Sequence, residues 1–347
     1  MIQLQGAENL TDFQNTTILY TMLTGNWSSC AIQTVARLGI ADHLNTGPRS
    51  ISDLAQATGT HAPSLYRLLR ATATLGLFQE ISAQVFIQTA LSSLLCVDHP
   101  NSLHHFALYI LSSSQVAAWS DLTYSVQTGR PSFEHQSGMN FWQFLHTHPD
   151  EHTIFNKAMS NTQVITYDVI LQTYDFSSLR SLVDIGGGYG QFVMMALKRF
   201  PSLQAIIFDQ PSVIEEARSL IAQSEYSERC QLQGGDFFHA VPAGVDAYFL
   251  QSVLFNWDDE HYVAILRPCR QAMLARSKLL IAEPMMSNTN TGFVQAFSDL
   301  QMLAILPAGA RVRSVEEHQI LCAKAGFSAL RVFPTSFPLS LLEVTIG

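Results

Sequence analysis

The chain has 347 residues, of which 47% are hydrophobic and 14% charged, so it can bury a large core in one large domain or two ordinary ones. Its formal net charge of -9, with 19 basic residues spread thinly, argues against nucleic acid as the partner. Five scattered cysteines without a C-x-x-C pair favour free thiols in a reducing compartment. We expect neither a signal peptide nor an apolar run long enough to span a bilayer. Together these features predict a cytoplasmic protein.

The N-terminal part is expected to be helical. Residues 12–46 carry apolar stripes at helical spacing. Residues 52–75 follow a helix-turn-helix pattern, with Ser52 as the expected N-cap of its first helix. The pattern occurs in DNA-binding winged helices, but the second helix carries only Arg67 and Arg70 as basic residues, which disfavours DNA contact.

Residues 181–211 are expected to form one strand-helix-strand unit. The buried strand SLVDI runs directly into a glycine-rich turn and a helix, and the next strand ends in Asp209, about 20 residues downstream. Glycines let the chain turn tightly and let a ligand touch the backbone, and a carboxylate in this place can accept both hydroxyls of a ribose. The alternative is an ordinary turn that binds no ligand.

The remaining pattern predicts alternating helices and strands and a closing antiparallel hairpin. After a short strand at 230–232, Asp236 could accept a hydrogen bond from an adenine amino group, with Phe237 against the ring; otherwise Asp236 is only a turn acid. The other expected elements are strands at 246–253 and 279–282 and helices at 103–165, 213–221, 259–273, 293–305 and 315–325.

The spacing D-x-G-x-G-x-G, formed by Asp184, Gly186, Gly188 and Gly190, resembles the first motif of S-adenosylmethionine-dependent methyltransferases. With LVDIGGGYG and FDQP, the chain more narrowly resembles the small-molecule O-methyltransferases of plants and bacteria. The helix-turn-helix region, the segment FNKAMS and the run GGDFF extend the resemblance from about residue 15 to the C-terminus.

The resemblance implies an α/β Rossmann-like class I methyltransferase domain and an α-helical, winged-helix-like N-terminal dimerisation domain. The expected parts are a dimerisation region at 1–100, a helical substrate roof and linker at 101–165, and a catalytic domain at 166–347. A homodimer through the N-terminal region is expected, with neither nucleic acid nor membrane as partner. The expected S-adenosyl-L-methionine site comprises Ser160, Asp184, Gly186, Gly188, Gly190, Asp209, Gln210, Gly235, Asp236, Phe237, Gln251 and Trp257, with Trp257 along the adenine.

The chain departs from the family where the general base is expected. Plant-type members carry His-Asp-Trp after the fourth strand of the domain, and the histidine removes a proton from the attacking phenol. Here Phe255 and Asn256 occupy the first two positions, and the family's second acid falls at Val312, whereas Glu283 is retained. This combination resembles a bacterial branch that acts on anthracyclines and related polyketides.

Other residues could take part in catalysis or hold the substrate. Arg311 could bind a carboxylate or polarise a carbonyl, with Asn256 adding a hydrogen bond, or it could form a surface salt bridge. The histidines of the helical region could supply a base or simply pack: His104, His105, His135, His146 and His148. The expected catalytic group is Phe255, Asn256, Glu283 and Arg311, and the expected substrate site is His105, Trp142, Phe144, Met159, Phe293, Phe297 and Met302, the last three alternatively being simple core residues.

Three functions remain open from the sequence. The first is methyl transfer to a hydroxyl of an aromatic or polyketide-type molecule, driven by proximity and orientation without the usual histidine. The second is an enzyme that binds S-adenosylmethionine without transferring its methyl, such as a cyclase, pericyclase, decarboxylase or hydroxylase. The third is a non-enzymatic partner built on the dimeric N-terminal half. No metal is expected.

Overall fold

The computed structural model describes residues 11–287 and 292–346, which fall into two compact units. One unit comprises the described residues up to Ser113 together with Thr153–Asn161, and the other comprises Ser114–His152 and the described residues from Thr162 onward. The finer division at residues 100 and 165 stays a prediction. The N-terminal unit contains α1 (Asp12–Leu23), α2 (Gly25–Arg37), α3 (Ile40–Leu44), β1 (Arg49–Ser50), α4 (Ile51–Thr58), α5 (Ala62–Thr74), β2 (Phe78–Ser82), β3 (Val85–Gln88), α6 (Ala90–Ser93) and α7 (His104–Ile110).

The N-terminal unit has the predicted helix-turn-helix followed by a β-hairpin. Helices α4 and α5 precede strands β2 and β3, and β1 completes an antiparallel sheet of order β1-β3-β2. The prediction of Ser52 as N-cap is wrong: the side chain of Ser50 accepts the first hydrogen bond, from the Asp53 N–H at 3.1 Å. Ile40, Leu54 and Phe86 are fully buried in the core of this unit, whereas α1 buries none of its side chains.

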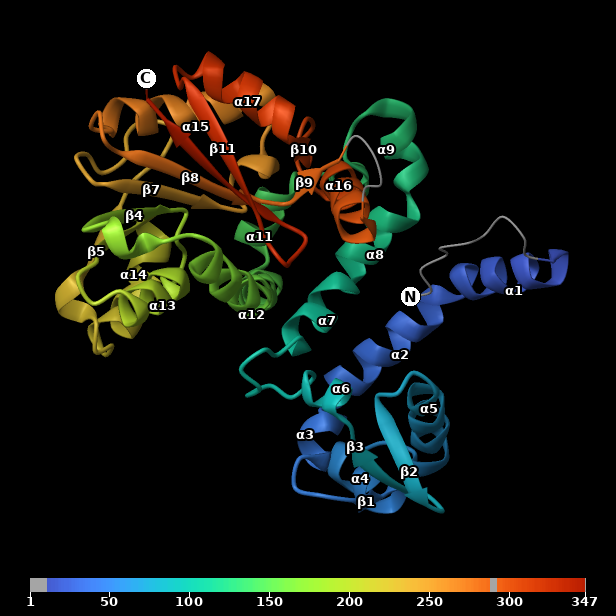
Figure 1. The fold of residues 1–347 in the computed structure, drawn as a ribbon. Helices are drawn as coiled ribbons and strands as arrows, with labels where there is room; N and C mark the ends of the chain where they lie inside the picture. Colours follow the sequence, from blue (N-terminus) through green and yellow to red (C-terminus); the bar gives the residue numbers. More distant parts are fainter. Residues whose placement is uncertain (1–10, 288–291, 347) are drawn as a thin grey trace. The chain divides into compact units, whose positions relative to one another are not determined.

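A seven-stranded sheet forms the centre of the second unit (Figure 1), and its order is β11-β12-β8-β7-β4-β5-β6. The strands from β8 to β6 are parallel, and β12 pairs antiparallel with both β8 and β11, so the expected closing hairpin is confirmed. The strands are β4 (Ser181–Ile185), β5 (Gln204–Asp209), β6 (Cys230–Gly234), β7 (Ala247–Gln251), β8 (Lys278–Glu283), β11 (Ala329–Pro334) and β12 (Ser340–Thr345), and a separate parallel pair is β9 (Met285–Met286) with β10 (Arg313–Ser314).

Helices cover both faces of this sheet (Figure 1). Alternate residues of each strand point to opposite faces, so the neighbours Val183 and Leu182 of β4 belong to different cores. One core contains side chains of α12 (Pro149–Thr173), α13 (Gln191–Arg199) and α14 (Pro211–Ala222), and the other contains side chains of α15 (Asp259–Ala272) and α17 (Val315–Lys324).

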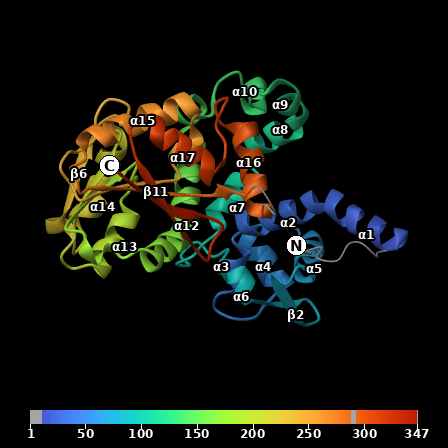
Figure 2. The ribbon, with the colours of Figure 1, turned by 45° about the horizontal axis from the view of Figure 1, so that its top comes forward.

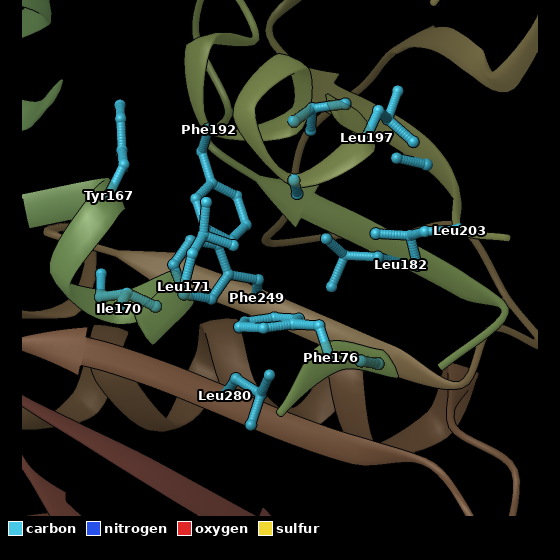
Figure 3. Close-up of a cluster of buried hydrophobic side chains, with 14 of the residues drawn as sticks. Tyr167, Ile170, Leu171, Phe176, Leu182, Phe192, Leu197, Leu203, Phe249 and Leu280 are labelled. Atoms are coloured by element: carbon cyan, nitrogen blue, oxygen red, sulfur yellow. The ribbon is translucent and has the colours of Figure 1, made fainter. Parts of the chain in front are cut away.

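Aromatic and aliphatic side chains pack together in the first of these cores (Figure 3). The ring of Phe192 on α13 stacks on Phe249 of β7, with centroids 4.0 Å apart and planes 24° apart. Phe176, in the short 3-10 turn η2 (Phe176–Ser178), is fully buried beside them. Such pairs add about 0.5–1.5 kcal/mol beyond the area they bury, and here they fix the helix that follows the glycine turn.

Helices α8 (Ser113–Ser120), α9 (Leu122–Thr128), α10 (Ser132–Ser137) and α16 (Phe293–Ile305) lie close to one another (Figure 2), and from Ser114 onward they belong to the same unit as the sheet. Ser132 on α10 donates its hydroxyl to the Ala304 carbonyl on α16 at 3.2 Å, and the Trp119 indole on α8 donates to Gln301 on α16. The same unit also contains α11 (Phe141–Thr147). None of the helices built from residues 11–287 and 292–346 combines the length and apolarity that a bilayer crossing needs.

Candidate active site

The two central strands β4 and β7 lead into helices on opposite faces of the sheet. Helix α13 follows β4 and packs in one core, and α15 follows β7 and packs in the other. Open α/β sheets bind ligands at the carboxyl ends of the strands where such a switch occurs. The predicted cofactor residues of this unit lie in the last two residues of β4, β5 and β7, or follow β4, β5, β6 and β7, at that edge.

The glycine turn and the acid of the next strand are joined directly. The Gly188 N–H donates to one carboxylate oxygen of Asp209 at 2.9 Å, and the Gln210 N–H donates to the other at 2.7 Å. Burial raises the pKa of Asp209, and these two bonds oppose the rise. Each oxygen keeps a second lone pair, so the carboxylate can still accept hydroxyl groups of a ligand.

Two glycines of the turn differ in their surroundings. Gly190 has φ +79°, and a Cβ there would lie 2.2 Å from Cδ1 of Ile207, so the turn packs tightly against β5. Gly188 has φ +55°, but among residues 11–287 and 292–346 no neighbouring atom lies within 4 Å of the place a Cβ would take. Gly188 therefore marks the open side of the turn, where a ligand can approach the backbone.

Asp184 lies beneath the turn rather than on its open side. Its carboxyl group is almost completely buried, and a Cβ on Gly187 would lie 2.9 Å from its Cγ. Burial, with a smaller contribution from the charge of Asp209, raises the pKa of Asp184 to about 8. Burial beneath the turn therefore favours the uncharged form of the Asp184 side chain.

An aromatic cluster forms where β6 and β7 end. Phe238 packs edge-on against Trp257 with ring centroids 4.9 Å apart, and Phe237 lies 6.3 Å from the same indole. Asp236 accepts from the Phe238 N–H at 2.9 Å and pairs with His239, as the turn-acid alternative requires. The predicted aromatic residues Phe237 and Trp257 are brought together, although they are 20 positions apart in the sequence.

Gln251, at the end of β7, has one amide atom without a hydrogen-bond partner in the part of the chain that the structure describes. Its Nε2 donates to the hydroxyl of Thr166 on α12 at 2.7 Å. Its Oε1 is buried and accepts no hydrogen bond from the described residues. Buried acceptors are nearly always satisfied, so an orphaned one beside a candidate ligand site suits a donor carried by the ligand.

Glu283 holds the loop that follows β7. Its side chain is 1% exposed, and Oε1 accepts from the N–H groups of Leu254 at 2.6 Å and Phe255 at 3.1 Å. Burial raises the pKa of Glu283 to about 7, opposed by these bonds and by the charge of Arg313. Its catalytic role stays a prediction, and the contacts show a carboxyl group engaged with backbone.

The polar side chains expected beside the reacting group also have partners within the protein. The Asn256 amide donates to the Ser252 carbonyl at 2.9 Å. The Arg311 guanidinium binds Asp259 at 3.1 Å and also contacts Glu317. These ion pairs agree with the salt-bridge alternative for Arg311, and a substrate-binding role for Arg311 or Asn256 stays a prediction.

The predicted acceptor residues of the second unit lie on two helices. On α16, the rings of Phe293 and Phe297 stack with centroids 4.2 Å apart and are 49% and 45% exposed, whereas Met302 is half-buried. On α11, Phe144 stacks on His148, and Trp142 is 36% exposed. Nearly half-exposed stacked phenyl rings differ from simple core residues, which favours a ligand-facing role for Phe293 and Phe297.

Three predicted site residues, His105, Met159 and Ser160, belong to the N-terminal unit, and their part in the site stays a prediction. Nδ1 of His105 is buried without a hydrogen-bond partner among the described residues. Burial lowers the pKa of His105, and the neighbouring His104 lowers it further. Neutral His105 thus keeps the form that a base requires.

Two residues outside the predicted set contribute to this edge of the sheet. Thr166 orients the Gln251 amide, and Arg313, fully buried, binds carbonyl groups of the loop after β7. Their signals in the sequence are weak, because a threonine inside a helix and an arginine near a turn are both common. Only the tertiary contacts distinguish them.

The arrangement fits S-adenosyl-L-methionine chemically. A carboxylate at the turn suits ribose hydroxyls, the aromatic cluster suits adenine, and the orphaned Oε1 of Gln251 suits a cationic donor. The mixed seven-stranded sheet with this turn defines a class I, Rossmann-like methyltransferase domain. The chain belongs to the O-methyltransferase family: residues 119–328 match the O-methyltransferase domain, and residues 20–98 match the O-methyltransferase dimerisation domain.

Known relatives agree over nearly the whole chain. The phenazine O-methyltransferase PhzM of Lysobacter antibioticus is 38% identical, covering 94% of this chain and 95% of the relative. The mitomycin biosynthesis 6-O-methyltransferase of Streptomyces lavendulae is 35% identical, covering 93% of this chain and 92% of the relative. Among solved structures, LaPhzM superposes with a TM-score of 0.90 at 37% identity, covering 96% of this chain and 99% of that chain.

Structures in this group include complexes with the reaction's by-product. CalO1, a methyltransferase in calicheamicin biosynthesis solved with S-adenosylhomocysteine bound, superposes with a TM-score of 0.86 at 26% identity, covering 98% of this chain and all of that chain. The protein is therefore an S-adenosyl-L-methionine-dependent O-methyltransferase of a family that serves secondary metabolism.

Proposed function

We propose that this enzyme methylates a hydroxyl group on an aromatic or polyketide-type small molecule of secondary metabolism, without the histidine base of plant-type relatives. The relatives named for phenazine and mitomycin support a ring-bearing acceptor, as does the 2,7-dihydroxy-5-methyl-1-naphthoate 7-O-methyltransferase of Streptomyces carzinostaticus, which is 31% identical over 91% of this chain.

One observation carries this proposal: the aromatic helix α16 is tied to the loop that bears Phe255. The Val312 N–H donates to Asp299 on α16 at 2.8 Å, and the neighbouring Arg311 N–H donates to the Phe255 carbonyl at 2.9 Å. The backbone of residues 311–312 therefore connects α16, which carries the stacked rings, to the loop that carries Phe255. Apolar and aromatic surfaces of this kind favour a planar ring system over a charged acceptor.

The residues of the chain position the acceptor, which reacts as its phenolate after its hydroxyl proton has passed to bulk solvent, so an acidic phenol needs no base from the protein. When bound, S-adenosyl-L-methionine supplies a methyl group on a positively charged sulfur, a strong electrophile. Glu283 fixes the backbone at Phe255, and the apolar side chain there excludes water from the acceptor oxygen. Proximity and orientation can supply about 7–11 kcal/mol of a barrier, whereas general-base help is typically worth about 10²–10⁴-fold.

The test is to incubate the enzyme with methyl-labelled S-adenosyl-L-methionine and hydroxylated phenazines, naphthoates and quinones, and to follow products by mass spectrometry. Labelled product in equal amount to S-adenosylhomocysteine supports the proposal. An acceptor that changes while the label stays on the cofactor would instead support a cyclisation, decarboxylation or hydroxylation function. Label on an amine and on none of the hydroxyl acceptors would contradict O-methylation of this class.

The variant Phe255→His tests the missing base separately. Because Glu283 holds the backbone of residue 255, the change replaces mainly the side chain. We expect at least a tenfold rise in the rate of a weakly acidic phenol, with a new dependence on pH near the ordinary pKa of histidine, about 6.5. Phe255→Leu serves as the control, because it keeps an apolar side chain without a titratable group. Equal rates for all three proteins would contradict an acceptor position beside Phe255.

We further propose that the enzyme acts as a homodimer through its N-terminal helical region and resides in the cytoplasm, with neither nucleic acid nor membrane as partner. The match to the dimerisation domain supports the assembly. All five cysteines are free thiols and four of them are buried, which agrees with a reducing compartment. The thin spread of basic residues argues against nucleic acid.

A further inference from the structure

Arg313 is a fully buried arginine whose guanidinium binds the loop after β7. It donates to the Leu254 carbonyl at 3.2 Å and to the Trp257 carbonyl at 2.7 Å. It also pairs with Asp259, the first residue of α15, at 2.9 Å, and its guanidinium carbon lies 5.0 Å from the ring centre of Tyr262. Burying an arginine is costly unless every donor has a partner, and here the loop itself supplies partners.

Glu283 binds the same loop through the opposite kind of group. It accepts from the N–H groups of Leu254 and Phe255, whereas Arg313 donates to the carbonyls of Leu254 and Trp257. Leu254 is thus held at both its N–H and its C=O. A fixed carboxylate and a fixed guanidinium together determine the path of the short 3-10 turn η4 (Leu254–Asn256).

Resting on the proposed function, we propose that Arg313 is a positioning residue that couples the two ends of the active site. The loop it holds presents Phe255 on the acceptor side and Trp257 on the adenine side, so displacement of the loop affects both. Asp259 keeps Arg313 in place: burial alone would raise the pKa of this carboxyl, but Arg313 and Arg311 outweigh that effect and lower it. Asp259 therefore stays charged at neutral pH.

Lysine is a poor substitute in this geometry. A guanidinium reaches the Leu254 carbonyl with one terminal nitrogen and the Trp257 carbonyl with the other, and its third nitrogen contacts Asp259 at 3.0 Å. An ammonium group is a single point with three donors and spans these acceptors less well. Arg313→Lys therefore keeps the charge and removes the planar fork, which separates positioning from simple charge compensation.

The chain offers a matched control in Arg229, which also binds backbone carbonyls. Its guanidinium reaches the Leu197 carbonyl at 2.7 Å and three further carbonyls just beyond the end of α13. Because α13 starts at the carboxyl edge of the sheet and runs back, this end lies away from the loop after β7. Arg229→Lys should lower thermal stability as Arg313→Lys does, without any change at the active site.

The experiment compares wild type, Arg313→Lys, Arg229→Lys and Asp259→Asn. Calorimetry with S-adenosylhomocysteine gives the number of competent sites and the affinity. Steady-state kinetics with the hydroxylated acceptor that the wild type methylates gives kcat and KM per competent site. For Arg313→Lys we expect a 10- to 100-fold loss of kcat/KM and a several-fold weaker S-adenosylhomocysteine affinity at unchanged stoichiometry. Asp259→Asn, which keeps the arginine, should move both quantities in the same direction by less.

A purely structural role predicts a different result. Arg313→Lys and Arg229→Lys would then share a lower melting temperature, and kcat/KM and affinity per competent site would stay within twofold of wild type, which would overturn the proposal. If no aromatic hydroxyl is methylated by the wild type, the proposed function fails, but the S-adenosylhomocysteine affinity still tests Arg313. In that case unchanged affinity in Arg313→Lys rejects the proposal, and weakened affinity supports it.

Discussion

Asp209 links the backbone of the glycine turn to the ligand it is expected to hold. Its carboxylate already accepts from Gly188 and Gln210, and the same oxygens can take the ribose hydroxyls of the cofactor. Hydrogen bonds to a charged group contribute about 1.5–3 kcal/mol each, so we expect Asp209→Ala to weaken S-adenosylhomocysteine binding by about 10- to 100-fold in calorimetry. Asp209→Asn, which keeps one acceptor, should lie between. Affinity within twofold of wild type for Asp209→Ala would place the ribose elsewhere.

Replacing each of the two glycines of the turn by alanine should impair a different property of the protein. Gly190→Ala forces a Cβ into Ile207 at a positive φ and should lower the melting temperature by several degrees or prevent folding. Gly188→Ala also requires a positive φ, which costs about 1 kcal/mol, but no atom of the described residues lies within 4 Å of the added Cβ. Its larger effect should be on cofactor affinity, because the new methyl group occupies the open side of the turn. Thermal unfolding and calorimetry on both variants check this contrast.

At the scale of helices and strands, local signals predicted most of the chain correctly. Helix α16 has the expected bounds, because Gly292 precedes it and Pro307 soon follows its end. The region 103–165 is helical as expected, but glycines break it: Gly129 and Gly138 end α9 and α10 with positive φ. The Ser52 error has a local cause as well, because Ser50 with Asp53 forms the serine-x-x-acid pattern of an N-terminus.

Helices α15 and α17 share a buried polar contact that should make stability depend on pH. The Tyr262 hydroxyl lies 2.7 Å from Nδ1 of His318, and Nε2 of His318 is buried without a partner among the described residues. Burial, and then the charge of Arg313, lowers the pKa of His318 to about 4. An unfolded histidine has a pKa of about 6.5, so in the window between these values the unfolded chain binds the extra proton.

The contribution of the neutral His318 ring to the free energy of unfolding is therefore fully present above about pH 6.5, and it is lost as the pH falls towards 4. The full loss is about 3 kcal/mol for this pKa difference. Calorimetric unfolding at pH 7.5, 6 and 5 should show a fall in melting temperature that is smaller in His318→Gln, which has no titrating ring. Parallel curves for the two proteins would mean that other groups, such as the paired acids Asp259 and Glu317, account for the acid sensitivity.

At the scale of the whole molecule, the sequence predicts candidate cofactor residues from their motifs, but it does not predict the residues that hold these motifs in place. Asp184, Asp209 and Trp257 lie in motifs whose spacing is visible along the chain. Arg313 and Thr166 act on partners about 56 and 85 positions away, and such contacts exist only after the sheet has formed. The roles of His105 and Met159 in substrate binding stay predictions, because both residues belong to the N-terminal unit.

The N-terminal unit should be the site of dimerisation. Within the described residues, α1 and the start of α2 expose large apolar side chains that a soluble monomer rarely leaves uncovered: Phe13, Leu19, Tyr20, Met22, Leu23 and Trp27. The match to the dimerisation domain begins at residue 20, within this surface. We therefore expect light scattering after gel filtration to give about twice the chain mass of 38.5 kDa.

A charge placed in this surface should separate the copies. Trp27→Asp and Leu23→Asp would each put an unpaired carboxylate among apolar partners, at a cost of several kcal/mol, and shift the species at micromolar concentration to a monomer. Val126→Asp on α9 is the matched control, because Val126 is 67% exposed, as Trp27 is at 65%, but lies outside the dimerisation match. A dimer that survives both N-terminal changes and dissociates with Val126→Asp would move the interface to the second unit.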